Sequence, residues 1–337
     1  DMMRVGGSFT SALTSFAGLG MALMLEEAGI ARVRLGWTDA TEPRLMISGQ
    51  GVDDLGIAKI VHAHAARSAT DDSWLEMSLE EKPWSSGTAV FSPRIKEAQS
   101  DEEWHYLQIK RSQGIDQVIE ESRRWLDLDF LGALGEPAYW RFRRNSPDPD
   151  QGASRWEMKT RNHGEEFVGN RLRSLAGIVA GRTVEGVLEG INGSSTVDEA
   201  YRGKRSDESR TATGLARPRF TDSALAWCGL WGLAAFPVVH RVRFPSTTAG
   251  HVRTGRRSEE LVVPVLIGRY SVERWRAVIV SSQVLAAVGD DLTVRRNARQ
   301  WLTRHGVRAV LHFPLQMTDN KFPERYLGDG RNELLTI

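Results

Sequence analysis

The stretch 222-DSALAWCGLWGLAAFPVVHRVRF-244 decides the fold, because it holds sixteen consecutive uncharged, mostly apolar residues between arginine-rich flanks. A membrane-spanning helix needs roughly 20 apolar residues, and this run is shorter and contains Pro237. A helix that is apolar on every side is buried in a folded protein. We therefore predict a core helix over residues 223–235, capped by Thr221 or Asp222 and ended before Pro237, with a surface that faces a partner protein as the alternative.

The spacing within this stretch also predicts how the helix packs. Trp227 and Trp231 lie one turn apart and share a face, whereas Gly229 and Gly232 leave room for a close neighbour on another face. We expect this helix to form the core of the C-terminal half and to anchor the arginine-rich segments beside it.

Composition places the chain among globular proteins. It has 337 residues, of which 41% are hydrophobic and 26% are charged. Cys228 is the one cysteine, which excludes an intrachain disulfide and a thiolate zinc site and fits a reducing compartment. Glu26 and Glu27 directly follow the apolar N-terminal stretch, without a clear small-residue cleavage site, so we expect a mature helix in a cytoplasmic protein.

The rest of the chain mixes helices with antiparallel strands. Apolar residues recur every three or four positions over 8–28, 52–67 and 101–128, which predicts helices, and alternation around the turn 39–43 predicts a β-hairpin. The other predicted elements are helices at 164–180, 183–191, 271–287 and 291–305 and strands at 238–244, 251–255, 261–269 and 307–313. No regular strand–helix–strand alternation is present, so we predict an α+β fold: an N-terminal helix and hairpin, then helices and antiparallel strands around the tryptophan-rich helix.

Charge divides the chain into two halves. Residues 1–140 carry 22 acidic and 13 basic side chains, a balance of −9, whereas residues 141–337 carry 21 and 31, a balance of +10. Prolines and a glycine break regular structure within 145–153. We therefore predict an acidic N-terminal domain over 1–144 and a basic C-terminal domain over 154–337. Such asymmetry indicates that one half meets a polyanion, or that the halves attract each other.

Basic residues of the C-terminal half gather in segments that also contain aromatic residues. Arginine binds phosphate through paired donors, and aromatic rings stack on bases. One segment, 192–220, is nearly thirty residues long with almost no apolar anchor, and a mobile basic loop that orders on a phosphate backbone fits this composition. An ordinary solvated arginine-rich surface is the alternative. The predicted phosphate contacts are Arg141, Arg143, Arg144, Arg161, Lys204, Arg205, Arg210, Arg217 and Arg219, with Asn145 and Asn162 as candidates for groove readout.

The sequence contains no convincing catalytic constellation. It matches neither a P-loop nor the GxGxxG fingerprint, and Cys228 lies in an apolar helix without a charged neighbour to activate it. His62 and His64 stand on different faces of the 52–67 helix, which makes joint metal binding poor. The acidic pairs that bracket this helix, Asp53-Asp54 and Asp71-Asp72, leave a metal-dependent nuclease as an alternative.

Two segments resemble a known family. Residues 9–29 (FTSALTSFAGLGMALMLEEAG) and 32–49 (RVRLGWTDATEPRLMISG) resemble the opening of large or large-like subunits of type I CRISPR effector complexes, especially the I-U (I-G) group. Such openings have Asn-Pro, then an aromatic residue, an Ala-x-Gly-Leu helix and a hairpin with Ser-Trp or Gly-Trp. Here Gly7-Ser8 replaces Asn-Pro, and the matching residues are Phe16, Ala17, Gly18, Leu19 and Trp37. The segment 207–242 is also similar, and the likeness covers residues 8–50 and 164–243.

The resemblance implies a noncatalytic subunit of an RNA-guided, DNA-targeting complex. Such a subunit contacts neighbouring Cas subunits, guide RNA and target DNA near the PAM, while a recruited helicase-nuclease cleaves the DNA. The charge division agrees, because the basic half can hold nucleic acid while the acidic half docks on basic subunits. We expect no cofactor, no metal ion and no membrane contact. A metal-dependent nuclease and a protein-only scaffold with a basic interaction surface remain the alternatives.

Overall fold

The computed structural model describes residues 2–93, 95–96, 98–121, 124–135, 153–158, 167–200, 212–239, 247–256, 258–319 and 323–336, and the backbone of 141–143 and 146–148. Within these residues, helices and antiparallel sheets form the α+β fold that the sequence predicts. No helix in this part of the chain is long and apolar enough to cross a membrane.

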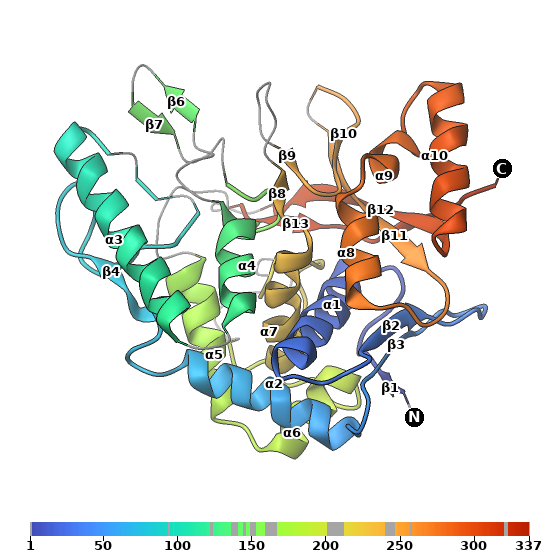
Figure 1. The fold of residues 1–337 in the computed structure, drawn as a ribbon, viewed down its shortest axis with the longest axis horizontal. Helices are drawn as coiled ribbons and strands as arrows, with labels where there is room; N and C mark the ends of the chain where they lie inside the picture. Colours follow the sequence, from blue (N-terminus) through green and yellow to red (C-terminus); the bar gives the residue numbers. More distant parts are fainter. Residues whose placement is uncertain are drawn as a thin grey trace.

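The helix expected from the opening stretch lies at the centre of the molecule (Figure 1). It consists of α7 (Ser223–Trp231) and a 3-10 turn, η7 (Gly232–Ala235). Asp222 caps α7 by accepting hydrogen bonds from the backbone N–H groups of Ala224 (2.8 Å) and Leu225 (3.2 Å). Every residue from Ser223 to Phe236 is buried, so the prediction of a capped core helix is confirmed.

The N-terminal helix α1 (Ala12–Glu27) packs directly against α7 and η7. Two glycines set how closely they approach: a Cβ added to Gly20 would lie 1.9 Å from the Cys228 carbonyl oxygen, and one added to Gly232 would lie 2.0 Å from that of Phe16. The predicted close approach at Gly232 is therefore confirmed. The predicted start of this helix at residue 8 was wrong, because Ser11 is extended (φ −103°, ψ 121°) and α1 begins after it.

The predicted N-terminal hairpin is present and belongs to a three-stranded sheet. β2 (Arg34–Trp37) and β1 (Met3–Arg4) both pair antiparallel with β3 (Leu45–Ser48). The outer edge of β2 bonds to a C-terminal segment, through Leu35 and Tyr270 (N to O, 2.9 and 3.1 Å) and from the Gly268 N–H to the Trp37 carbonyl (3.0 Å). This seam joins the N-terminal sheet to the C-terminal half.

The C-terminal sheet has the strand order β10 (His251–Arg253), β11 (Glu259–Leu266), β12 (Val307–Met317) and β13 (Arg325–Leu327), and β14 (Arg331–Leu334) also pairs with β12. The helices α8 (Val272–Val280), α9 (Ser282–Ala286) and α10 (Leu292–Arg304) connect β11 to β12. The strands predicted at 251–255, 261–269 and 307–313 are thus present. Of the strand predicted at 238–244, β8 (Val238–Val239) is described, paired with β9 (Thr247–Thr248), and residues 240–244 lie outside the described part.

A second group of helices packs against α7 and α1, to the left of and below them in the view of Figure 1. It contains α2 (Asp54–Ser68), a π-helical turn η5 (Val168–Arg173) that continues into α5 (Ser174–Ala180), and α6 (Val184–Asn192). Between α2 and η5 lie a 3-10 turn (Trp74–Glu76) and two short paired strands, β4 (Ser78–Leu79) and β5 (Thr88–Ala89). The predicted helices at 52–67 and 183–191 are confirmed to within two residues, and the one at 164–180 over its described part.

The single helix predicted over 101–128 was wrong. The chain forms α3 (Asp101–Glu120) and then α4 (Trp125–Leu134), because Glu121 adopts an extended conformation (φ −73°, ψ 96°). The intervening residues 121–124 read ESRR and offer no apolar side chain to continue the buried face of α3. After the break, α4 packs against η7 and buries Phe130, Leu131 and Leu134, with the Phe130 ring stacked on Trp231 of α7.

One hydrophobic core serves both halves of the chain. It includes Phe16, Trp37 and Phe130 from the acidic half and Trp231 and Trp275 from the basic half. The acidic and basic halves are therefore packed together along α1 and α7. Of the predicted boundary at 145–153, the described part includes β7 (Ser146–Asp148), which pairs with β6 (Arg141–Arg143).

Candidate nucleic-acid interface

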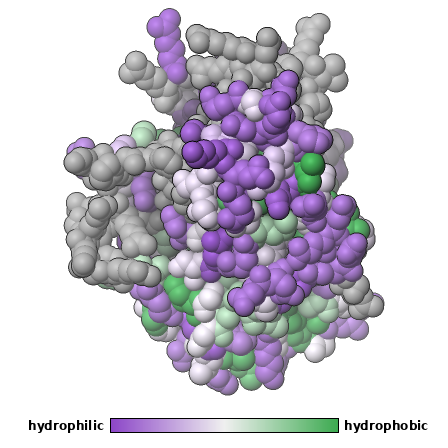
Figure 2. Space-filling view, turned by 90° about the vertical axis from the view of Figure 1, so that its left-hand side faces the viewer, coloured by the Kyte–Doolittle hydropathy of each residue, from purple (hydrophilic) through white to green (hydrophobic). Residues whose placement is uncertain are grey.

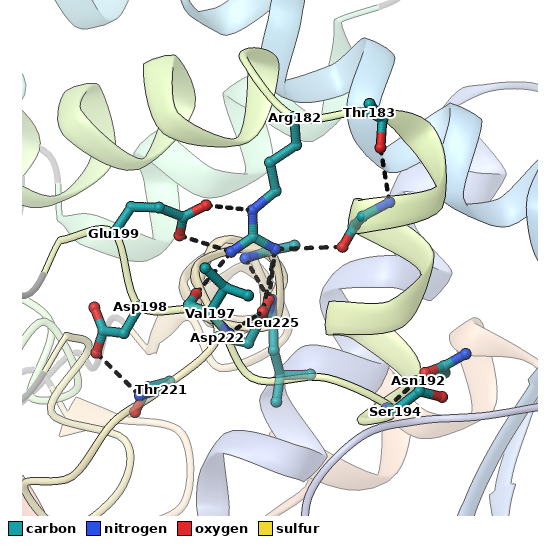
Figure 3. A network of polar contacts seen from close by, with 12 residues as sticks. Arg182, Thr183, Asn192, Ser194, Val197, Asp198, Glu199, Thr221, Asp222 and Leu225 are labelled. Atoms are coloured by element: carbon teal, nitrogen blue, oxygen red, sulfur yellow. Dashed lines mark hydrogen bonds and ion pairs between the residues drawn. The ribbon is translucent and has the colours of Figure 1, made fainter.

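The long basic segment 192–220 is anchored at its first end by Arg182, which lies between α5 and α6 (Figure 3). Its guanidinium donates to both carboxylate oxygens of Glu199 (2.6 and 2.7 Å), to Asp222 (3.0 Å) and to the Val197 carbonyl (2.7 Å). Val197 in turn donates its N–H to Asp222 (3.0 Å), and Asp198 accepts a hydrogen bond from the Thr221 N–H (3.0 Å). These contacts fix residues 197–199 against the start of α7.

The anchor is nearly buried, so its charges depend on one another. The side chains of Arg182 and Asp222 are 9% and 3% exposed. Burial lowers the pKa of Arg182, but its hydrogen bonds to Glu199 and Asp222 outweigh burial and raise that pKa above its usual value. Glu199 shows the opposite balance: burial raises its pKa, and the hydrogen bonds from Arg182 and Ser223 lower it below the ordinary range. Glu199 therefore stays ionised beside a charged Arg182.

The second end of the segment is held by backbone contacts. The Thr213 carbonyl accepts a hydrogen bond from the buried Arg171 guanidinium (2.7 Å), and the Leu215 carbonyl accepts one from the Leu13 N–H (2.9 Å). Gly214 accepts from the Leu327 N–H (2.8 Å), and Leu215 is fully buried. The segment is thus tied to η5, α1 and β13 before it reaches α7.

Two of the predicted nucleic-acid contacts lie on this fixed end. Arg217 and Arg219 are both exposed, and Phe220 beside them is 50% exposed. Arg217 pairs with Asp329 at 3.3 Å, but both side chains are more than half exposed (55% and 59%), so the pair is weak and can exchange for phosphate. The structure brings these two arginines together on a surface that water reaches.

The other predicted contacts are described only in part or not at all. Arg141 and Arg143 lie on β6, of which only the backbone is described, paired with Asp148 and Ser146 of β7. The predicted contacts that lie outside the described residues are Arg144, Asn145, Arg161, Asn162, Lys204, Arg205 and Arg210.

One basic–aromatic pair of the C-terminal half is structural. Trp156 is fully buried, and its indole N–H donates to the Ala249 carbonyl (2.9 Å). Arg155 beside it forms an ion pair with Glu259 at 2.7 Å. Neither residue is placed to hold a base or a phosphate.

A second basic surface, absent from the sequence-based predictions, lies where α8 begins and α10 ends. We call it the Trp301 surface. Arg274 of α8 reaches the carbonyl of His305 at the end of α10 (3.3 Å) and lies over the Tyr270 ring, 6.0 Å from its centroid. The members of this surface are Tyr270, Arg274, Trp301, Arg304, His305 and Arg308, of which the three arginines are exposed and the three rings are half-buried.

The signal for this surface is present in the sequence. The segments 267–277 (IGRYSVERWRA) and 299–308 (RQWLTRHGVR) interleave arginine with aromatic residues, as 139–144 does. Each segment alone is an amphipathic helix end with an ordinary polar face. Their significance comes from their contact, which local sequence does not reveal.

The acidic pairs of the nuclease alternative are far apart. Asp53 and Asp54 lie at the start of α2, where Asp53 caps the helix by accepting from the Gly56 N–H (2.8 Å), and Asp71 and Asp72 follow its other end. A helix of 15 residues is about 22 Å long, whereas two-metal nuclease sites hold their ions about 4 Å apart. Across the described residues, no three His, Cys, Asp or Glu side chains are placed to hold a metal ion.

The candidate histidine and cysteine residues have structural surroundings. His64 is 4% exposed, packs edge-on against Trp231 with ring centroids 4.4 Å apart, and has no hydrogen-bond partner among the described residues. Burial lowers the pKa of His64 well below its usual value, so the ring is neutral. Burial likewise raises the pKa of the Cys228 thiol, which makes it a poor nucleophile. His62 faces elsewhere and contacts the Ala180 carbonyl (3.1 Å).

A buried ionic cluster joins α1, α2 and α4. Arg67 forms ion pairs with Glu27 (2.6 Å) and Asp127 (2.9 Å), and the Trp74 indole N–H donates to Asp127 (2.9 Å). Burial raises the pKa of Asp127, and it raises that of Glu27 to about 7. Both carboxylates are engaged and largely shielded from water, so the cluster ties helices together.

No protein-family model matches the chain, and no curated protein matches it. The assignment of function therefore rests on the residues and their geometry.

Proposed function

We propose that the chain is a noncatalytic, nucleic-acid-binding subunit of a cytoplasmic RNA-guided effector complex. In this proposal the basic half holds the backbone of guide RNA or target DNA. The observation that carries the proposal is the anchoring of the basic segment 192–220, which is fixed at both ends while Arg217 and Arg219 are exposed. A basic segment held at both ends loses less conformational freedom on binding than a free tail does.

The acidic half supplies a second surface, which we propose docks on basic neighbouring Cas subunits. The exposed acids of α3 include Asp101, Glu102, Asp116 and Glu120. On the face that carries α3, hydrophilic residues predominate and apolar residues appear in small separate groups (Figure 2). Such a face favours an electrostatic contact over a hydrophobic one. DNA cleavage is assigned to a recruited helicase-nuclease, in line with the separation of the aspartate pairs across α2.

Charge reversal within the anchored segment tests the nucleic-acid assignment. We expect the double variant Arg205→Glu and Arg210→Glu to weaken duplex DNA binding. It should also flatten the dependence of log K on log salt by about 0.9 for each phosphate that the variant no longer binds. The matched control reverses Arg32 and Lys59, two exposed residues of the acidic half, which changes the net charge equally. An unchanged salt slope in the first variant would contradict the assignment of this segment.

Copurification from the native host tests the assembly. A tagged chain should bring down Cas subunits together with RNA, and nuclease treatment should remove the RNA. A complex that forms without nucleic acid and survives nuclease treatment would favour a protein-only scaffold instead. Cleavage of labelled DNA with Mg²⁺ or Mn²⁺ that Asp53→Ala abolishes would favour a nuclease.

A further inference from the structure

The Trp301 surface combines stacked rings with arginines from two elements. Trp301 and His305 stack with centroids 3.8 Å apart and planes inclined by 23°, and the His305 ring is held by a hydrogen bond between Nδ1 and the Trp301 carbonyl (2.7 Å). Both rings are half-buried, so they are supported by the protein and also reached by water. A fixed, partly exposed stack of this kind is a platform on which a planar base can continue the stack.

The surface is held rigidly where α8 and α10 meet. Gly306 lies against the Tyr270 ring so closely that an added Cβ would come within 2.3 Å of it. Tyr270 is itself fixed by backbone hydrogen bonds to Leu35 of β2. Arg274, beside Tyr270, and Arg308, which contacts the Thr303 carbonyl at 3.5 Å, flank the stack. The rings and arginines therefore need little reordering to meet a ligand.

The acidic residues nearest in the sequence face other partners. Glu273 interacts electrostatically with Arg34 and Arg276, and a hydrogen bond from Ser271 lowers its pKa. Asp291 caps the start of α10, thirteen residues from the helix end that carries Arg304. The three arginines of the surface thus present positive charge beside the stacked rings.

We infer that the Trp301 surface binds an unpaired nucleic-acid strand, with bases on the Trp301–His305 stack and phosphates on Arg274, Arg304 and Arg308. The inference rests on the proposed function for the class of ligand but assigns it to a different surface from the 192–220 segment. Stacked rings favour an unpaired strand because bases in a duplex are already stacked on each other. They also favour nucleic acid over an acidic peptide, whose carboxylates need the arginines but not the rings.

Fluorescence anisotropy with a labelled 15-nucleotide single strand tests this inference, in separate DNA and RNA arms, with the matching duplex and a poly-glutamate peptide for comparison. One variant, His305→Ala, removes half of the stack and keeps every arginine. A second, Arg304→Glu with Arg308→Glu, alters two exposed side chains and leaves the rings in place. The control, Arg253→Glu with Arg256→Glu, alters exposed arginines at the other end of β11, a strand of eight residues and about 27 Å.

We expect His305→Ala to weaken single-strand binding by about tenfold and duplex binding much less, because stacking on one base contributes that much. The double-arginine variant should also reduce the salt slope by about 0.7 for each phosphate that it no longer binds. If the wild-type chain binds single strands and both variants bind them as tightly as the control variant does, the inference is wrong and the proposed function stands. If the chain binds no nucleic acid at all, both fail. If the variants lose binding to poly-glutamate but keep binding to the single strand, the inference is wrong and the surface binds an acidic protein.

Discussion

Replacing Gly232 by alanine tests the packing that organises this fold. The added methyl group would lie 2.0 Å from the Phe16 carbonyl oxygen, well inside van der Waals contact, and that neighbour is backbone that cannot rotate away. Either α1 or η7 must therefore shift. Overpacking of a core costs about 1–3 kcal/mol, and the contact with backbone places this change in the upper part of that range, about 2–3 kcal/mol.

The expected change in melting temperature follows from the size of the protein. An unfolding entropy of about 2.1 cal/mol/K per residue gives about 0.7 kcal/mol/K for 337 residues. A loss of about 2–3 kcal/mol then lowers Tm by about 3–4 °C. Differential scanning calorimetry measures the shift, and circular dichroism checks that the secondary structure is retained.

Gly132→Ala is the matched control. Gly132 lies within α4, and a Cβ added there meets nothing within 4 Å. The same substitution should stabilise the protein by about 0.5–1 kcal/mol, because alanine loses less backbone entropy than glycine on folding. A Tm of Gly232→Ala equal to or above that of the unmodified protein would refute the close α1–η7 contact as a determinant of stability.

Four other substitutions give distinct outcomes. Arg182→Met leaves the buried Asp222 carboxylate without its cation and should lower the free energy of unfolding by about 3–5 kcal/mol, measured by denaturation in guanidinium chloride. Arg217→Met alters a side chain that is more than half exposed and should lower it by less than about 1 kcal/mol. Equal losses would contradict the role of Arg182 as a buried anchor. Burial raises the pKa of Glu27 from 4.5 to about 7, so its favourable contribution is full below pH 4.5 and is lost as the pH rises through 7. Glu27→Gln should therefore lose less stability than the unmodified protein between pH 5 and 8, measured by urea titrations. An identical loss would argue against a raised pKa of Glu27. Burial lowers the pKa of His64, so the ring stays neutral in the folded protein while the unfolded chain binds a proton. The free energy of unfolding therefore falls as the pH drops below the ordinary pKa of histidine. His64→Phe should reduce the loss of stability between pH 7 and 5. If the variant loses as much stability over this range as the unmodified protein, another group titrates there.

Patterns confined to one element could be read from the sequence. Asp222 and the apolar run that follows it predict the cap, the buried helix and the shared face of Trp227 and Trp231, whose ring centroids lie 5.6 Å apart. Hydrophobic periodicity and turn residues act within a few positions, so they also locate α2 and the N-terminal hairpin.

Contacts between distant residues could not be read in this way. Arg182 meets Asp222 forty positions later, and Arg274 meets His305 from a different helix. Nothing in the local sequence distinguishes Arg182, which is part of a buried anchor, from Arg219, which is exposed. The basic character of the C-terminal half was evident, but which arginines serve structure and which face water depends on their partners.

The packing of α1 against α7 has a consequence for synthesis of the protein. At translation rates of about 5–20 residues per second, α1 emerges some 10–40 s before α7 is complete, because about 200 residues separate them. During that time the face of α1 that packs on α7 and η7 has no partner to cover it. This face of α1 is thus sheltered late in synthesis, which favours slow folding through long-range contacts.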